Sequence, residues 1–70
     1  MQNATVELSL IRIPEVEKRT GLSRASIYRL ARVGEFPKSI KIGLRASAWI
    51  ESEVDAWVHA RIAEARRAAA

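Results

Sequence analysis

The stretch TGLSRASIYRLARVGEFP, residues 20–37, decides the fold, because it holds a turn, a helix start and a helix stop in succession. Gly21 interrupts one helix, and the hydroxyl group of Ser23 is suited to cap the N-terminus of the next. Gly34 can adopt the left-handed conformation in which many helices end. Together these signals predict a helix over residues 24–33.

Another helix is predicted just before this stretch, over residues 14–20. Pro14 fits the first turn of a helix, where its missing N–H group would have no partner in any case. The carboxylates of Glu15 and Glu17 suit the positive end of the helix dipole. Two short helices separated by a glycine-containing turn have the spacing of a helix-turn-helix.

After this motif the sequence changes to a two-residue alternation, which indicates β-strands. Ile40 and Ile42 are expected to point to one face of a strand that is buried on that face. Residues 43–45 are expected to form a tight turn, and residues 46–50 to return as a second strand with Trp49 as an apolar anchor. Because a two-stranded hairpin is marginally stable alone, this wing should pack on the helices.

A third helix is predicted to begin near Ser52, because Ser52 followed by Asp55 resembles a capping box. Apolar residues at helical spacing along this helix are expected to cover the core: Val54, Trp57, Val58, Ile62 and Ala65. The predicted fold class is therefore mainly α with a small β-hairpin: a winged helix-turn-helix with three helices and a two-stranded wing.

A chain of 70 residues has room for one domain with a small core. We assign residues 10–66 to this domain, residues 1–9 to a flexible N-terminal tail in which Leu8 and Leu10 could form a short strand, and residues 67–70 to a frayed C-terminus. The absence of cysteine excludes disulfide frameworks and thiolate zinc sites. Neither a signal peptide nor an apolar run of about 20 residues is found, so we expect a cytoplasmic protein.

The positive charge of the chain is concentrated in its middle. The formal net charge is +4, and between Ser23 and Arg45 six lysine and arginine residues accompany one acidic residue, Glu35. This asymmetry is typical of a surface that meets a polyanion, whereas excess charge of either sign also keeps a small domain soluble. Charge alone leaves both interpretations open.

The exposed face of the helix over residues 24–33 carries candidate DNA contacts. Ile27, Leu30 and Ala31 share its buried face, and the second helix of a helix-turn-helix normally reaches base edges in the major groove. Arginine can hold guanine through two hydrogen bonds, serine can bind a phosphate or a base, and alanine leaves room for a thymine methyl group. The candidates on this helix are Ser23, Arg24, Ala25, Ser26, Tyr28, Arg29 and Arg32.

Three basic residues of the wing complete the candidate site. Arg45 lies at the hairpin turn and could enter the minor groove of double-stranded DNA, while Lys38 and Lys41 could lie along the phosphates. If about six cations each neutralise a phosphate, the logarithm of the affinity should fall with the logarithm of the salt concentration with a slope of about −5.

Over residues 10–58 the chain resembles the AlpA family of phage and integrative-element regulators, which is related to MerR-type winged helix-turn-helix proteins and to small excisionases. The marks of the resemblance are LIRIPEV, TGLSRASIYR, GEFPKSIKIG, the R-x-S-A-W pattern at residues 45–49, and SEVDAW. The resemblance places the following residues in the DNA-reading helix and at the wing tip: Ser23, Arg24, Ser26, Tyr28 and Arg29, and then Arg45.

The resemblance also implies a function. It implies a sequence-specific double-stranded DNA-binding transcriptional regulator of a prophage or integrative element, which controls integrase or excision genes in the bacterial cytoplasm, at the nucleoid. The alternative is an excisionase, a recombination directionality factor that binds and bends attachment-site DNA. Implied partners are double-stranded DNA, further copies of the chain as a dimer or cooperative array, and an integrase; neither a membrane nor a small-molecule effector is expected.

Aromatic residues of the chain allow a second interpretation. Tyr28 could cover the edge of the core instead of contacting DNA. Trp49 and Trp57 could stack on single-stranded nucleic acid if they were exposed, but their places on apolar stripes predict that they belong to the core.

Neither an enzyme, a cofactor site nor a metal site is expected. His59 is the only histidine, and without cysteine or a recognisable nucleophile it supports neither a metal site nor a catalytic dyad, so we expect an exposed helix residue. Glu51, Glu53 and Asp55 could hold a divalent ion, but the N-terminus of the third helix accounts for them. A further alternative is a helical protein-interaction adaptor built on the third helix, although the small core needs the apolar stripe of that helix.

Overall fold

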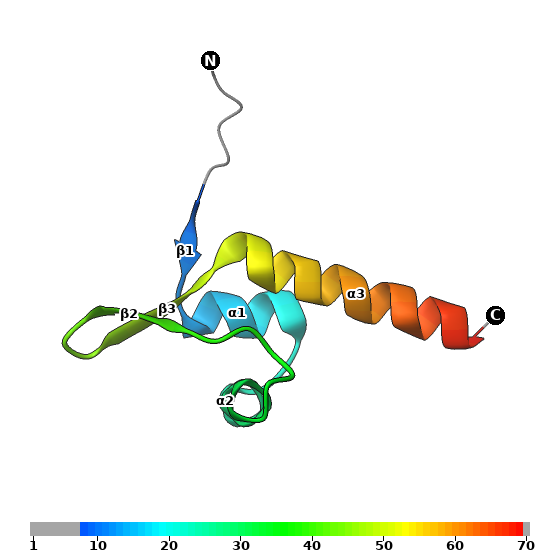
Figure 1. Ribbon diagram of the computed structural model, residues 1–70, viewed down its shortest axis with the longest axis horizontal. Coiled ribbons are helices and arrows are strands. Elements are labelled where there is room, and N and C mark those ends of the chain that lie inside the picture. Colours follow the sequence, from blue (N-terminus) through cyan, green and yellow to red (C-terminus); the bar gives the residue numbers. More distant parts are fainter. Residues whose placement is uncertain (1–7, 70) are drawn as a thin grey trace, which may run out of the picture.

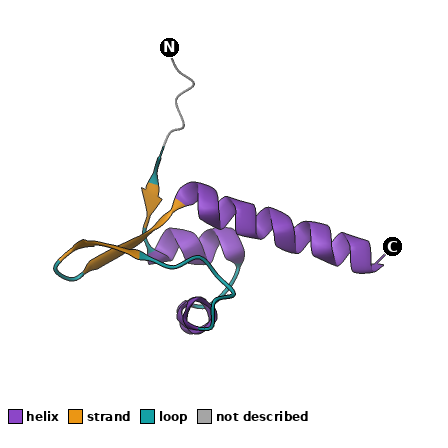
Figure 2. Ribbon diagram, viewed as in Figure 1, coloured by secondary structure: helices purple, strands orange, loops and turns teal. Residues whose placement is uncertain are grey.

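A computed structural model describes residues 8–69 of the chain. The elements in chain order are β1 (Leu10–Ile11), α1 (Ile13–Thr20), α2 (Arg24–Arg32), β2 (Ile40–Gly43), β3 (Ala46–Ile50) and α3 (Glu51–Ala69). Figure 1 shows α2 end-on below α1, with the β2–β3 hairpin and α3 extending in opposite directions. Figure 2 separates the helices from the small sheet by colour. The mainly α-helical fold with a β-wing, predicted from the sequence, is confirmed.

The helix-turn-helix forms where it was predicted. α1 begins at Ile13, one residue before the predicted start. It ends at Thr20, and its C-cap Gly21 has a left-handed φ of 74° and donates its N–H to the Glu17 carbonyl oxygen at 2.8 Å. Thr20 Oγ1 then accepts a hydrogen bond from the N–H of Leu22 at 3.1 Å. These contacts satisfy backbone groups in the turn, and the chain can enter α2 at a sharp angle to α1.

Both ends of α2 are closed by the predicted residues. Ser23 Oγ accepts a hydrogen bond from the N–H of Ser26 at 3.1 Å, as an N-cap does. At the other end Gly34 has a left-handed φ of 82° and donates its N–H to the Ala31 carbonyl oxygen at 3.2 Å, while the next N–H along the chain donates to the Leu30 carbonyl oxygen at 2.8 Å. This pair of bonds is the Schellman motif, which stops the helix and reverses the chain.

The sheet has three strands in the order β1-β3-β2: the predicted two-stranded wing forms from β2 and β3, and β1 joins it at the other edge of β3. β1 pairs antiparallel with β3, with Leu10 opposite Ile50 and Ile11 opposite Trp49. The sequence allowed a short strand at Leu8 and Leu10, and Leu10 lies in β1. Its pairing with β3 was not predicted, because two residues are too few to show an alternation of apolar and polar residues.

β2 is more exposed than its sequence pattern predicted. Ile40 and Ile42 are 40% and 47% exposed, although the alternation predicted a buried face. The inner strand β3 meets the core instead, through the buried residues Ala48 and Trp49. Figure 1 shows the reason: the hairpin extends past the helices, so no element covers its outer part.

The core is small and draws on both helices of the helix-turn-helix, β3, the start of α3 and the loop after α2. Its buried cluster is Val16, Ile27, Phe36, Trp49 and Val54. The indole N–H of Trp49 donates to the Pro37 carbonyl oxygen at 3.0 Å, so this buried polar group is satisfied. Trp57 packs edge-on against Phe36 with ring centroids 4.9 Å apart and donates its N–H to the Glu35 carbonyl oxygen at 2.8 Å. The prediction that both tryptophans serve the core is confirmed.

α3 follows β3 without a loop, and the capping-box interpretation of Ser52 and Asp55 was wrong. The helix begins at Glu51, so Ser52 lies inside its first turn. The N–H of Glu51 donates to the Ser9 carbonyl oxygen at 2.8 Å. The carboxylate of Asp55 binds Arg19 of α1 instead of a backbone N–H. The strand leads directly into the helix, so the residue before the helix is Ile50, whose side chain has no oxygen to accept a backbone N–H.

The predicted apolar stripe of α3 covers the core only over its first two turns. Val54 is buried, and Trp57 and Val58 are half-buried. Ile62 is 44% exposed and Ala65 is exposed, so the prediction that they cover the core was wrong. Figure 1 shows α3 continuing beyond the end of α1, where no other element lies beneath it.

The predicted termini are described only in part. Residues 1–7 and 70 lie outside the described residues, and Leu8 is exposed and lies outside β1. α3 continues to Ala69, through three of the residues that were expected to fray, and their fraying stays a prediction. Within residues 8–69 no helix is both long enough and apolar enough to cross a membrane.

Candidate nucleic-acid interface

The first turns of α2 hold serine and arginine side chains in a connected arrangement. Besides capping the helix, Ser23 Oγ donates a hydrogen bond to Ser26 Oγ at 3.0 Å. Arg29 Nη2 donates to the same Ser26 oxygen at 3.3 Å. The guanidinium group of Arg29 therefore folds back toward the N-terminus of α2, the end that contacts bases in helix-turn-helix proteins.

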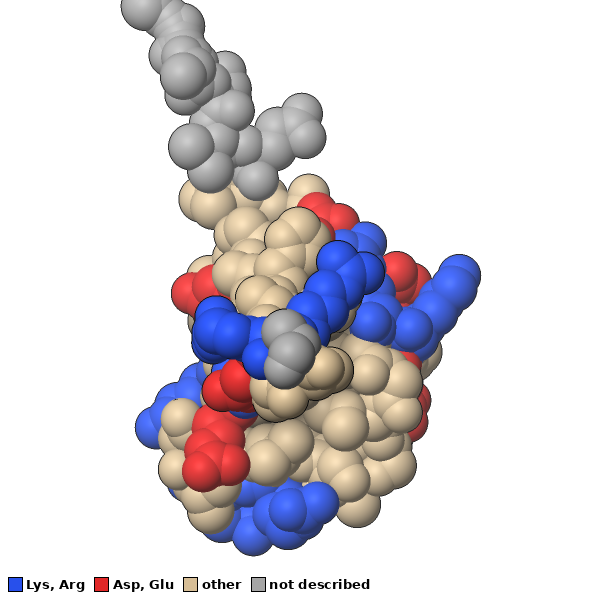
Figure 3. All heavy atoms as spheres, turned by 90° about the vertical axis from the view of Figure 1, so that its right-hand side faces the viewer, with Lys and Arg blue, Asp and Glu red and all other residues tan. Residues whose placement is uncertain are grey.

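α2 has the two faces that the sequence predicted. Ile27 is buried, and Leu30 and Ala31 are half-buried. The exposed residues of the helix include Arg24, Ala25, Tyr28, Arg29 and Arg32. Figure 3 shows lysine and arginine side chains at the lower end of the molecule, where Figure 1 places α2, and others higher on the same view. The solvent face of α2 is therefore basic.

Tyr28 lies between the core and this basic face. Its ring packs on Trp49 with centroids 5.8 Å apart, and the guanidinium carbon of Arg24 lies 5.9 Å from the ring centroid. The residue as a whole is 37% exposed. Tyr28 therefore covers the edge of the core, as one of its two interpretations held, and remains accessible to a ligand.

An open hollow of about 520 Å³ joins α2 to the segment that leads into the wing. Its lining residues are Tyr28, Ala31, Arg32, Lys38 and Ser39. The hollow thus brings together three predicted site residues, two of them cations from different parts of the chain. Ser39 was not predicted, because only the chain reversal after α2 brings it beside that helix.

The two remaining predicted residues lie farther out on the wing. Lys41 is exposed in β2, opposite Ser47 of β3, and Arg45 is exposed in the turn that closes the hairpin. Neither lines the hollow. Figure 1 shows the hairpin tip projecting away from α2, so the wing residues and the helix residues of the candidate site lie on separate parts of the surface.

The basic residues of this surface have no carboxylate partners within the part of the chain that the structure describes. The ion pairs there involve Arg19 and Arg61 as the cations. The unpaired cations of the middle segment are Arg24, Arg29, Arg32, Lys38, Lys41 and Arg45. Their charge is therefore available to neutralise a polyanion.

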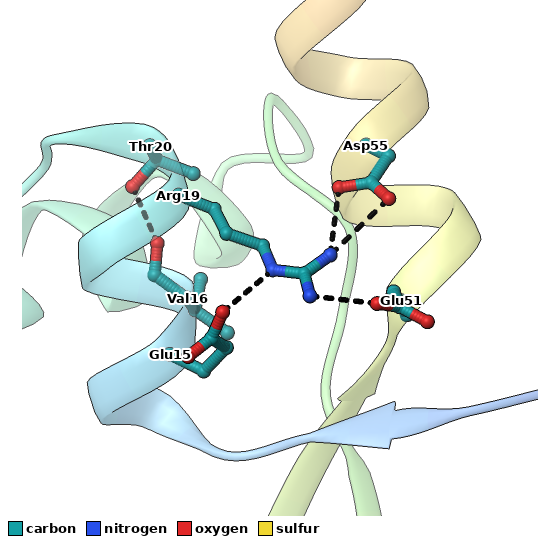
Figure 4. A network of polar contacts seen from close by, with 6 residues as sticks. All are labelled: Glu15, Val16, Arg19, Thr20, Glu51 and Asp55. Carbon is teal, nitrogen blue, oxygen red and sulfur yellow. Dashed lines mark hydrogen bonds and ion pairs between the residues drawn. The ribbon is translucent and has the colours of Figure 1, made fainter.

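Arg19 of α1 connects the helix-turn-helix to the junction of β3 and α3, as Figure 4 shows. Its guanidinium group lies 2.9 Å from a carboxylate oxygen of Glu15, 2.6 Å from one of Glu51 and 3.0 Å from one of Asp55. The hydrogen bond with Glu15, followed by the one with Glu51, raises the pKa of Arg19 above its ordinary value. This network links α1 to the first turns of α3, directly after β3.

The network also explains the acidic start of α3. Glu51 and Asp55 face Arg19, while Glu53 is exposed. Only the pair of Glu15 and Arg19 could have been predicted from the sequence, because a spacing of four residues brings side chains together on a helix. The contacts of Arg19 with α3 have no such signal in the sequence.

Within residues 8–69 no group of three or more His, Cys, Asp and Glu side chains could hold a metal ion. His59 is exposed on α3, as predicted.

Comparison with known proteins identifies relatives for most of the chain. Residues 9–62 match a family model described as "Prophage CP4-57 regulatory protein (AlpA)". This range includes every residue of the candidate interface, from Ser23 to Arg45.

Two curated proteins are similar over most of the same region. The chain is 49% identical over 57 residues to "Uncharacterized protein ORF88" of Enterobacteria phage P4, an alignment that covers 81% of this chain and 65% of the phage protein. It is 34% identical over 58 residues to the "DNA-binding transcriptional activator AlpA" of Escherichia coli (strain K12), with 74% of this chain and 83% of that protein covered. The chain thus spans just under two thirds of the length of the phage P4 relative.

Proposed function

We propose that this chain, which belongs to the AlpA family of prophage regulatory proteins, binds double-stranded DNA sequence-specifically and regulates transcription of the integrase or excision genes of a prophage or integrative element. The relative from Escherichia coli that is named a DNA-binding transcriptional activator supports an action on DNA, at 34% identity. The function places the protein at the nucleoid, in the bacterial cytoplasm.

The observation that carries this proposal is the unpaired positive charge on the solvent face of α2 and around the adjoining hollow. Arg24, Arg29 and Arg32 are exposed along one helix, and Lys38 joins Arg32 at the hollow. A protein helix fits the major groove of B-form DNA, and cations at its sides can bind the phosphates of both groove walls. A surface that serves only solubility needs no such concentration of one sign on one helix.

In the proposed complex α2 lies in the major groove with its N-terminal turns toward the bases. Arg24 and Arg29 are the candidates for two hydrogen bonds to guanine, and Ser26 already positions Arg29. Arg32 and Lys38 bind phosphates from the hollow. Arg45 reaches the adjacent minor groove from the hairpin turn.

Several copies are expected to act together. A single winged helix of this size contacts few base pairs, and known helix-turn-helix proteins gain specificity by binding two half-sites. We therefore propose that the chain occupies its operator as a dimer or a short cooperative array, and that an integrase binds nearby when the operator lies in an attachment site.

Selection of bound duplexes from a random DNA pool tests the proposal. The wild-type chain should enrich a defined sequence, and Arg24→Ala should weaken its binding by about 1–3 kcal/mol while relaxing the preference at one base pair. Arg66→Ala on α3 removes the same charge away from the interface and is the matched control. Failure to bind any duplex at low salt, or equal effects of the two substitutions, would contradict the proposal.

Salt dependence separates phosphate contacts from base contacts. For the selected duplex we expect the slope of log affinity against log salt to be about −5 in the wild type. Lys38→Ala should weaken binding to all sequences alike and make the slope less steep by about 1. A slope near zero would show that the exposed cations do not face the phosphates.

A further inference from the structure

The tip of the wing exposes a leucine. Leu44 and Arg45 form the turn between Gly43 of β2 and Ala46 of β3. Leu44 is 93% exposed, the largest exposed fraction among the large hydrophobic residues that the structure describes. Figure 1 shows this tip at the end of the hairpin that lies farthest from α3.

Leu44 has no evident role in folding. The buried cluster contains no residue of β2 or of the hairpin turn. Exposed hairpin turns favour glycine, asparagine and aspartate, which adopt the required backbone conformations and are well hydrated. A leucine at this position leaves its apolar surface in water, and the fold recovers nothing from it.

The surroundings of Leu44 indicate the chemistry of its partner. Arg45 follows it directly, and Lys41 is exposed three residues before it. Ile42, 47% exposed, extends the apolar surface inward along β2. An apolar side chain flanked by unpaired cations is complementary to the minor groove of duplex DNA, where phosphates border stacked bases. A protein interface would require a much larger apolar patch than this tip offers.

We propose that Leu44 is a wedge that inserts from the minor groove between two base pairs and kinks the DNA. This inference rests on the proposed function, in which α2 lies in the major groove and the wing reaches the neighbouring minor groove. Lys41 binds a phosphate at the edge of the groove and Arg45 enters the groove beside Leu44, and both contacts direct the leucine inward. Side chains of this kind unstack a base step and bend the duplex by about 20–90°.

The test uses the duplex that the selection experiment returns, labelled with a donor and an acceptor dye at its ends. With wild-type protein, energy transfer should rise as the duplex bends, and a fluorescent adenine analogue at the kinked step should brighten as it unstacks. Leu44→Ala should lower the bend angle by at least half and weaken binding by about three- to tenfold. Leu44→Phe should preserve both signals, because phenylalanine also serves as a wedge.

Leu8→Ala is the matched control, because Leu8 is also strongly exposed, at 75%, but lies outside the wing. It should change neither signal. An unbent wild-type complex, or equal bending by wild type and Leu44→Ala, would overturn the wedge while leaving the proposed function intact. Loss of self-association by Leu44→Ala in sedimentation, with bending unchanged, would also overturn it and assign Leu44 to a contact between copies. Absence of any binding by the wild type would instead refute the proposed function.

Discussion

α3 is one continuous helix, but its two halves lie in different surroundings. We call residues 51–58 the inner half and residues 59–69 the outer half. The inner half contributes the buried Val54 and the half-buried Trp57 and Val58 to the core. It is also bound to α1 through Arg19. In the outer half every residue is exposed, including Ile62 on the same apolar stripe.

The difference shows that an apolar stripe determines which face of a helix can be buried but not how far along the helix burial extends. Helical spacing continues through Ile62 and Ala65, yet no other element lies beneath them. The extent of burial is set by the lengths of α1 and the sheet, which are short. The wing shows the same effect, because Ile40 and Ile42 follow a strand pattern beyond the reach of the core.

The largest expected difference between the two halves lies in core packing. Val54→Ala should lower the free energy of unfolding by about 2 kcal/mol, because the cavity left by its methyl groups would be fully enclosed. Ile62→Ala removes a larger apolar group but should change that free energy by less than about 0.5 kcal/mol. Urea denaturation followed by circular dichroism measures both. Equal losses would show that the outer half is buried in solution.

A smaller difference is expected from the ion pairs of the two halves. Arg19→Met should destabilise the fold, because it leaves Glu15, Glu51 and Asp55 close together without a cation. The loss should be smaller than that of Val54→Ala, since these charged groups are partly exposed and water screens them. Arg61→Met is the control, since Arg61 pairs with Glu64 at 3.5 Å on the exposed half, where such pairs contribute little.

The Arg19 effect should diminish as salt rises, because salt screens the repulsion between the carboxylates. Thermal unfolding of both variants at low and high salt provides the measurement. If Arg19→Met and Arg61→Met melt at the same temperature, the network does not hold α1 to α3.

The smallest effect is expected from removal of most of the outer half. A chain without residues 63–70 should keep its free energy of unfolding within about 0.5 kcal/mol of the full chain, since the described part of that segment, residues 63–69, contributes no buried side chain. It should also bind the selected duplex with the same sequence preference. A loss of stability that depends on protein concentration would show that the outer half associates with a second copy.

Local signals predicted the helix-turn-helix and much of the candidate interface. Ser23, Gly21 and Gly34 act at the places where their side chains or backbone preferences predicted caps and turns. The basic face of α2 followed from helical spacing, because residues on one helix face share an environment whatever packs behind them. The pairing of β1 with β3, the Arg19 network and the hollow beside Ser39 were missed, since each joins segments that are distant in the sequence.

By itself the sequence determined the helices of the helix-turn-helix, their caps, the hairpin strand over residues 46–50 and the concentration of positive charge between Ser23 and Arg45. These properties depend on backbone preferences and on neighbours within one helical turn or one strand pair. Only the tertiary structure decided where α3 leaves the core, that β1 joins the sheet, and that Arg32 and Lys38 share one hollow. Those outcomes depend on element lengths and chain reversals, which place residues together only after the whole domain has packed.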